Sequence, residues 1–176
     1  MSSTTSSSNK RNSIVPPLSQ AGPRPAVKIA PSVTIDGAAH LTGSHPIGIG
    51  AESVIHPRAK LNSLGGRITV GRRCIVEERA TLGAPSAEAR QGVTLGDYVV
   101  VHVDAVVEAG GTVVQDGAVI GVGARVGKGA VIGKYCTLAP MEVVAPGEAL
   151  PDYTVVYGNG LRRTDRSVIL DEFEAK

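Results

Sequence analysis

Four histidines are the residues whose side chains could most readily do chemistry, and their spacing limits what that chemistry can be. They are His40, His45, His56 and His102. Three imidazoles and a water molecule form a common catalytic zinc site. Only His40 and His45 stand five residues apart, and the position five residues after His102 is Val107. A three-histidine zinc site therefore stays open as an alternative, while four separate surface histidines are the simpler interpretation.

A second chemistry open to histidine is general-base catalysis, in which a neutral imidazole removes a proton from an acceptor. His56 and His102 are the candidates, because each directly follows an aliphatic residue of the repeat described below. Neither lies in a GxH or HxG context, and no pantetheine-binding loop or basic C-terminal segment is present. The glycine-rich run at 121–129 lacks the GK[ST] ending of a phosphate loop. Acyl transfer stays open as a second alternative, and a phosphate loop is excluded.

Composition excludes several other classes of function. The net charge is +2, and the chain has one Phe, four Tyr and no Trp, so aromatic stacking on nucleic-acid bases has few residues to use. Cys74 and Cys136 lie too far apart in sequence for a CxxC metal site, and we expect both to be reduced and buried. No apolar run is long enough for a membrane span. The sequence thus predicts neither nucleic-acid binding nor membrane insertion.

The elements that would position these side chains follow from an internal repeat, since an aliphatic residue recurs every six positions. A small residue stands four positions after most of these residues, and glycine often follows directly. The aliphatic series is Ile29, Ile35, Leu41, Ile49, Ile55, Leu61, Val70, Val76, Leu82, Leu95, Val101, Val107, Val114, Ile120, Val126, Ile132, Leu138 and Val144. Helical spacing fits this pattern poorly, and the 22 glycines would destabilise helices. The pattern predicts repeated short strands.

A six-residue repeat of this kind predicts an all-β, single-stranded parallel β-helix. Each hexad forms a strand and a corner, three hexads form a triangular coil, and eighteen hexads form about six coils. The aliphatic residues stack inside a narrow prism, the small residues face inward near corners, and glycine occupies corners where φ can become positive. Coils contact only their neighbours, so stability accumulates along the stack.

The interruptions and ends of the repeat predict the organisation of the chain. We expect a disordered Ser- and Pro-rich tail at 1–26, a β-helix at 27–158 with a loop at about 84–92, and a turn with a short helix at 159–176. Ile169 and Phe173 would lie on the apolar face of that helix and cover the C-terminal end of the prism. The N-terminal edge near Ile29 has no evident cap and is a candidate interface.

Four segments resemble the family of dynactin subunit six. They are VKIAPSVTI (27–35), SVIHPRAKL (53–61), ITVGRRCIVEERATL (68–82) and VVYGNGLRRTDR (155–166), of which the last is the most specific. The resemblance covers about residues 27–166 and implies the left hand of the β-helix, which spacing alone does not establish. It also implies a place beside subunit five, a pointed-end actin-related protein and a large zinc-motif subunit, with dynein and cargo as indirect partners.

The sequence therefore leads to a non-catalytic structural subunit of the dynactin pointed-end complex that supports dynein-driven microtubule transport. We expect a cytoplasmic, cytoskeleton-associated protein without catalytic, metal or cofactor-binding residues. The residues expected to contact partners are Ile29, Leu161, Arg162, Arg163, Ile169 and Phe173. A γ-class carbonic anhydrase-like enzyme and a hexapeptide-repeat acyltransferase remain the alternatives.

Overall fold

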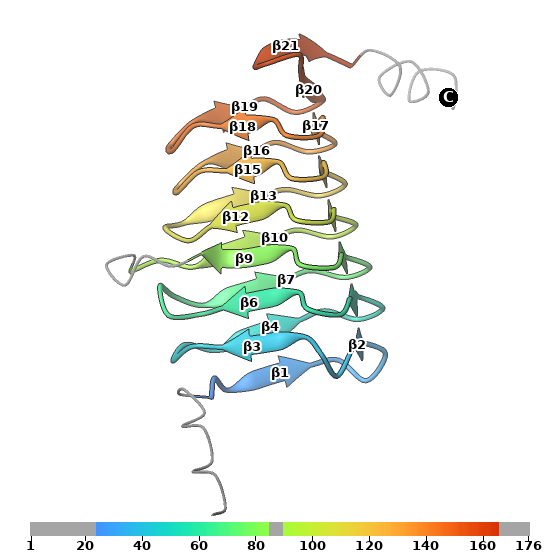
Figure 1. Ribbon diagram of the computed structural model, residues 1–176, viewed down its shortest axis with the longest axis vertical. Coiled ribbons are helices and arrows are strands. Elements are labelled where there is room, and N and C mark those ends of the chain that lie inside the picture. The colour runs from blue at the N-terminus through green and yellow to red at the C-terminus, as the bar shows by residue number, and fades with distance from the viewer. Residues whose placement is uncertain (1–23, 85–89, 166–176) are drawn as a thin grey trace, which may run out of the picture.

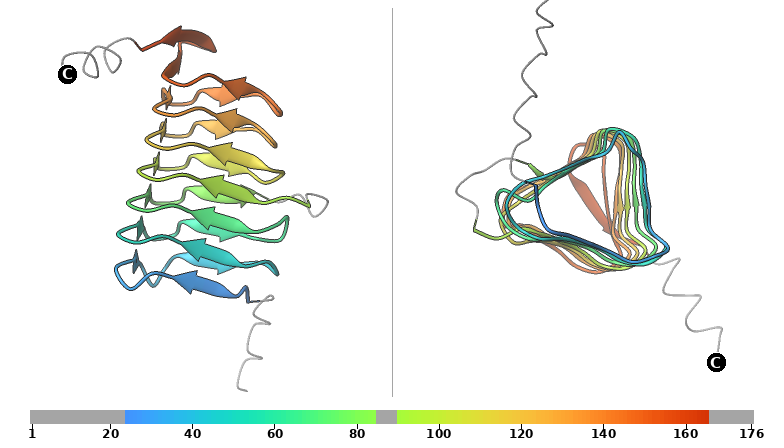
Figure 2. Two further views of the ribbon diagram at one scale, coloured as in Figure 1. Left: turned by 180° about the vertical axis from the view of Figure 1, so that it is seen from behind. Right: turned by 90° about the horizontal axis from the view of Figure 1, so that it is seen from below.

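The computed structural model describes residues 24–84 and 90–165, which form a tall stack of short strands (Figure 1). The chain passes through three strands per turn, so that strands three apart in sequence lie side by side in parallel sheets. Viewed along the stack, the coils superimpose as a triangle (Figure 2). The predicted all-β solenoid is confirmed, because the 6-stranded sheet defines six complete coils and two strands of a further coil follow.

Three sheets, named A, B and C in chain order, form the sides of the prism. Sheet A contains β1 (Val27–Ile29), β4 (Ile47–Ile49), β7 (Ile68–Val70), β10 (Val93–Leu95), β13 (Thr112–Val114), β16 (Val131–Ile132) and β19 (Ala149–Leu150). Sheet B contains β2 (Thr34–Ile35), β5 (Val54–Ile55), β8 (Ile75–Val76), β11 (Val100–Val101), β14 (Val119–Ile120), β17 (Thr137–Leu138) and β20 (Thr154–Tyr157). Sheet C contains β3 (His40–Thr42), β6 (Lys60–Asn62), β9 (Thr81–Ala84), β12 (Val106–Glu108), β15 (Arg125–Val126) and β18 (Val143–Val144). The turns that join them are the A–B, B–C and C–A corners.

The aliphatic residue of each hexad fills the interior of the prism. In sheet C, Leu61 lies in register with Leu82, and Val107 lies in register with Val126. All four are fully buried, and so is the small residue Ala80. A narrow triangular interior packs to native density only with small, stiff side chains, which explains a core of Val, Ile, Leu and Ala. The predicted six-residue register is therefore confirmed.

The glycines that directly follow strands of sheet A allow close approach of successive coils rather than positive φ. A Cβ on Gly71 would lie 2.2 Å from the carbonyl oxygen of Gly96 in the next coil. The left-handed backbone occurs two residues after each of these glycines, at Arg73 (φ 54°) and Tyr98 (φ 60°). These glycines thus mark backbone contacts between coils. The left-handed turn position, three residues after the strand, is held by Arg73, by Tyr98 or, after β13, by Gly117 (φ 68°).

The two ends of the prism differ. At the N-terminal end, β1 is an edge strand and Ile29 is exposed. At the C-terminal end, β21 (Leu161–Thr164) pairs antiparallel with β20, a strand that the sequence analysis does not anticipate. The buried Glu142 carboxylate holds the connecting turn by accepting backbone N–H groups at 2.9 Å from Asn159 and at 2.9 Å from Gly160.

The expected C-terminal helix begins at Asp165, and its other residues, 166–176, lie outside the described part of the chain. Ile169 and Phe173 belong to this segment, so their expected partner contacts lie outside it too. Within the described residues, no helix has the length and hydropathy needed to span a bilayer.

Candidate functional site

The B–C corner brings together residues that directly follow the strands of sheet B. His102 follows β11 and Glu77 follows β8, one coil earlier. The strands pair in parallel with Val101 opposite Val76, so the next residue of each strand faces its counterpart across the same corner. His56 occupies the equivalent position after β5. The repeat therefore stacks one chemically distinct residue per coil at this corner.

His102 and Glu77 form a hydrogen-bonded pair on the surface of the prism. The distance from His102 Nδ1 to Glu77 Oε2 is 3.0 Å, and both side chains are about one-third exposed, at 35% and 29%. The same oxygen accepts the backbone N–H of Val103 at 3.1 Å, which fixes the carboxylate. Because an ionised carboxylate only accepts hydrogen bonds, the imidazole proton lies on Nδ1 and Nε2 keeps a free lone pair. This is the arrangement that a general base requires.

Ion pairs surround the His102–Glu77 pair toward the N-terminal end. Arg79 donates to Asp104 from Nη2 at 2.7 Å and from Nε at 2.8 Å. These hydrogen bonds hold the pKa of Asp104 below its ordinary value, so Asp104 stays ionised and paired with Arg79. Arg58 similarly pairs with Glu78 at 3.3 Å. The neighbouring acids are thus occupied, and Glu77 is the carboxylate hydrogen-bonded to the histidine.

Toward the C-terminal end, the same corner becomes small and apolar. The next coil presents Gly121, Val122 and Gly123, and the coil after it presents Met141. Val122 is 44% exposed and Met141 is 74% exposed. Met141 packs over Gly123, because a Cβ on this glycine would lie 2.6 Å from the Met141 sulfur. A narrow apolar chain could lie on this surface beside the histidine.

A groove of about 790 Å³ runs over the outer face of sheet C. Its lining starts at Val106, four residues after His102, where β12 leaves the B–C corner. The other lining residues are His40, Thr42, Lys60, Asn62, Thr81, Glu108, Ala109, Arg125 and Lys128. The groove and the histidine pair therefore belong to neighbouring parts of the same surface.

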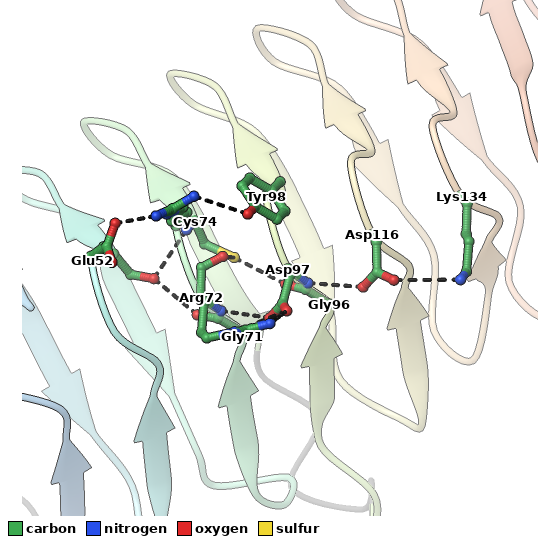
Figure 3. A network of polar contacts seen from close by, with 11 residues as sticks. Glu52, Gly71, Arg72, Cys74, Gly96, Asp97, Tyr98, Asp116 and Lys134 are labelled. Carbon is green, nitrogen blue, oxygen red and sulfur yellow. Dashed lines mark hydrogen bonds and ion pairs between the residues drawn. The ribbon is translucent and has the colours of Figure 1, made fainter. Parts of the chain in front are cut away.

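The A–B corner carries a different polar network, drawn in Figure 3. Arg72 donates to Asp97 Oδ2 at 2.8 Å, and Asp116 accepts the Asp97 backbone N–H at 2.9 Å and pairs with Lys134 at 3.5 Å. The Arg72 hydrogen bonds hold the pKa of Asp97 below its ordinary value. Each charged group here already has a partner, so this network stabilises the stack rather than offering a reactive group.

Both cysteines are free and buried, as predicted. Cys74 lies at the A–B corner, and its thiol donates to the Gly96 carbonyl oxygen at 3.0 Å. Burial raises the pKa of the Cys74 thiol and that of the Cys136 thiol. Both therefore stay protonated at neutral pH, and neither is an activated nucleophile.

The structure separates the other three histidines. His40 lies at the start of β3 in the sheet C groove, and His45 Nδ1 lies 2.9 Å from the Ser63 carbonyl oxygen. His56 occupies the B–C corner two coils before His102. Across residues 24–84 and 90–165, no three His, Cys, Asp or Glu side chains group to hold a metal ion. A zinc site gains no support from these residues.

The described residues expected to contact partners lie at the two ends of the prism. Ile29 is 54% exposed on the β1 edge, and Leu161 is 58% exposed on β21. Arg162 forms an ion pair with Glu148, and the Arg163 guanidinium lies 5.8 Å from the Tyr157 ring centroid. Their role in partner binding stays a prediction.

Glu77 is the functional residue that the sequence analysis misses. Its signal was present in the repeat, because Glu77 directly follows Val76 just as His102 directly follows Val101. Two residues in the same hexad position of successive coils are neighbours in space, although 25 residues separate them in the sequence.

The class that this architecture defines is the left-handed β-helix of hexapeptide-repeat proteins, and solved structures with this fold match the chain. One is a hexapeptide transferase family protein from Anaplasma phagocytophilum, with a TM-score of 0.70 and 17% identity over 88% of this chain and 92% of that chain. Another is a proposed acetyltransferase from Bacillus cereus, with a TM-score of 0.58 and 23% identity over 86% and 88% of the two chains.

A third similar structure is a point mutant of AntD, an N-acyltransferase from Bacillus cereus, in complex with dTDP-4-amino-4,6-dideoxyglucose and coenzyme A. Its TM-score is 0.59, with 17% identity over 88% of this chain and 91% of that chain. No protein-family model matches the sequence, and no curated protein matches it. These comparisons establish the fold, and none of the three structures is described as a dynactin subunit.

The expectation of a non-catalytic dynactin subunit is therefore wrong. The structures that share the prism are described as transferases, including one with coenzyme A bound. The physical error lay in treating all four histidines as separate surface residues, whereas His102 is held by Glu77. The expectations of no enzymatic activity and of dynein-driven transport rested on the same interpretation and fall with it, and cytoskeletal association gains no support.

Proposed function

We propose that the chain is a coenzyme A-dependent acyltransferase in which His102 is the general base. The observation that carries this proposal is the 3.0 Å hydrogen bond between His102 Nδ1 and Glu77, which leaves Nε2 free to accept a proton. The fold supports it, since AntD, an N-acyltransferase, has the same architecture and was solved with coenzyme A. The acceptor would carry a hydroxyl or amine group.

The corner residues fit such a substrate. Exposed Val122 and Met141 give the surface beside His102 an apolar character that suits a slender thioester arm. A bound acyl-coenzyme A supplies the activated acyl group. His102 Nε2 takes the proton of the acceptor as the acceptor forms its bond to the acyl carbon.

Glu77 positions His102, because its hydrogen bond to Nδ1 fixes the ring with Nε2 directed away from the carboxylate. The fixed Oε2 atom, held by the Val103 N–H, also prevents the ring from rotating away. When the carbon–sulfur bond breaks, the imidazolium returns the proton to the departing thiolate, which leaves as the free thiol. The proton taken from the acceptor therefore leaves with the thiol, and Glu77 takes no part in the transfer itself.

The experiment that tests this proposal measures thiol release from acetyl-coenzyme A over a panel of amine and hydroxyl acceptors. We expect His102→Ala to lower kcat by about 10²- to 10⁴-fold while the unfolding midpoint stays unchanged. The matched control is His56→Ala, which removes an imidazole from the equivalent position two coils earlier and should keep full activity.

Ligand binding gives an independent test that needs no acceptor. Acetyl-coenzyme A should raise the unfolding temperature of the wild-type chain, because a ligand that binds only the folded state stabilises it. No thermal shift at millimolar acetyl-coenzyme A, together with no thiol release from any acceptor, would remove the proposal.

A further inference from the structure

The sheet C groove carries an excess of positive charge that the acyl-transfer proposal does not use. Its basic residues Lys60, Arg125 and Lys128 form no ion pair with any residue in the described ranges. Many cations elsewhere on the prism each pair with a carboxylate, namely Arg58, Arg72, Arg73, Arg79, Lys134 and Arg162. The groove thus gathers three cations without an ion pair to a described residue on one concave surface.

The groove has two cationic ends and a neutral floor. Lys60 and Arg125 begin β6 and β15, and Thr81 and Val106 occupy the matching positions on the two strands between them. Three strand spacings separate the Lys60 and Arg125 backbones, which is about 14 Å. Their long side chains can bend toward each other over the floor. A ligand that meets both ends must therefore be elongated and carry more than one negative charge.

Lys128 is exposed and lines this groove, and its aliphatic stem lies against the backbone. A Cβ on Gly110 would lie 2.3 Å from Lys128 Cγ, so the lysine stem lies directly on the backbone of Gly110. This placement requires glycine and holds Lys128 at the same end of the groove as Arg125. Both cations line the groove from one coil, so an anion bound over this coil would face two positive charges.

One carboxylate, that of Glu108, lies in the groove lining and offsets only part of the charge of the three cations. Glu108 uses its Oε2 atom to accept the backbone N–H of Lys128 at 3.1 Å. Side chains with hydrogen-bond donors surround the floor, namely those of Thr42, Asn62 and Thr81, with His40 at the N-terminal end. Cations with adjacent hydroxyl and amide donors are the group set that binds phosphate oxygens.

We infer that the sheet C groove binds a ligand with at least two phosphate groups, one held by Arg125 and Lys128 and another by Lys60. This inference goes beyond the proposed acyl transfer, because phosphate binding is measured without turnover. Two sources share the chemistry, a nucleotide and an inorganic polyphosphate. The probes that separate them are adenosine 3′,5′-bisphosphate and inorganic tripolyphosphate.

The test is isothermal titration of the full chain with each probe at low salt. We expect Arg125→Gln or Lys60→Gln to weaken binding by about tenfold, and added salt to weaken it further. Arg163→Gln is the matched control, since it removes one positive charge from β21 in sheet B and should leave affinity unchanged. Lys128→Gln should act like Arg125→Gln.

The relative affinities of the two probes identify the class of ligand. Tighter binding of adenosine 3′,5′-bisphosphate assigns the groove to a nucleotide, and tighter binding of tripolyphosphate assigns it to an inorganic polyphosphate. Absence of binding by both probes at millimolar concentration overturns the inference. Equal losses in Arg125→Gln and Arg163→Gln overturn it as well, because they would show general attraction to a basic surface. Phosphate binding without acyl transfer would reject the proposed function and keep the groove.

Discussion

The A–B and B–C corners of this prism have the same backbone and different chemistry. Both place one side chain per coil in a vertical ladder, and both use left-handed residues in the turn, such as Tyr98 and Asp104. At the A–B corner, the Arg72–Asp97 and Asp116–Lys134 pairs leave no charged group of the network without a partner. At the B–C corner, the pair of stacked side chains is Glu77 and His102, and the imidazole of His102 has one ring nitrogen outside the hydrogen bond.

The difference shows that the hydrogen-bond partners of a corner side chain, rather than its position in the hexad, decide whether it stabilises the stack or can take part in proton transfer. At the A–B corner, the Asp97 carboxylate is bound by Arg72 through both the side chain and the backbone N–H. At the B–C corner, Glu77 binds His102 through one ring nitrogen and the other nitrogen stays free. A closed network resists unfolding, whereas a pair with one free lone pair can move a proton. Three predictions separate these roles.

The largest effect should come from Val126→Asp, which removes the support that both corners share. Val126 is fully buried between Val107 and Val144 in sheet C, so the aspartate would place an unpaired charge inside the prism. We expect a loss of about 4 kcal/mol or more in the free energy of unfolding, measured by chemical denaturation. This loss is enough to unfold much of the chain.

The matched control for Val126→Asp is Val143→Asp on the next strand of the same sheet. Val143 is 56% exposed and lies beside Arg125, so its substitution should change stability little. If the two variants were equally stable, the inward and outward positions of the hexad would be wrongly assigned, and neither corner would have the geometry described above.

The second effect should come from Glu77→Gln, which alters catalysis without altering the fold. The glutamine oxygen can still accept from both the Val103 N–H and the His102 Nδ1–H, because one Glu77 oxygen makes both contacts. The neutral amide has no negative charge to place beside the imidazolium that forms during proton transfer. We expect kcat to fall by roughly 10- to 100-fold while KM changes little. Steady-state assays of thiol release at several pH values measure this.

Glu78→Gln is the control for Glu77→Gln, because Glu78 lies at the same corner and pairs with Arg58. Its activity should match that of the wild type. A structural role for Glu77 predicts something else, namely a lower unfolding midpoint with unchanged kcat. Glu77→Asp should restore part of the activity, since it returns a carboxylate that accepts from the imidazole.

The interior of this prism could be predicted from the sequence, whereas the reactive pair could not. The interior depends on a period within the local sequence, so the six-residue repeat of aliphatic residues was enough to place Val107 and Val126 inside the prism. The pairing of Glu77 with His102 depends on which coils are adjacent, and the break in the repeat after β9 obscures that register. β21 was missed for a related reason, because it reverses direction and follows no hexad.

The smallest effect should appear at the A–B corner under acid conditions. Hydrogen bonds from Arg72 hold the pKa of Asp97 below its ordinary value, and those from Arg73 do the same for the pKa of Glu52. A carboxyl group with a lower pKa in the folded state adds stability above its unfolded pKa, and this contribution disappears as the pH falls through the folded pKa. Acid should therefore weaken this corner progressively.

Arg72→Gln tests this, because it removes the guanidinium that lowers the pKa of Asp97. Its unfolding midpoint should lie slightly below that of the wild type at neutral pH, and the difference should vanish once the pH has fallen below the lowered pKa of Asp97 in the folded wild type, where Asp97 is protonated in both proteins. Its acyl-transfer rate should stay unchanged, because the A–B corner has no reacting group. A midpoint difference that persists or grows in acid would mean that Arg72 stabilises the coil by packing. A loss of activity in this variant would mean that the two corners are coupled.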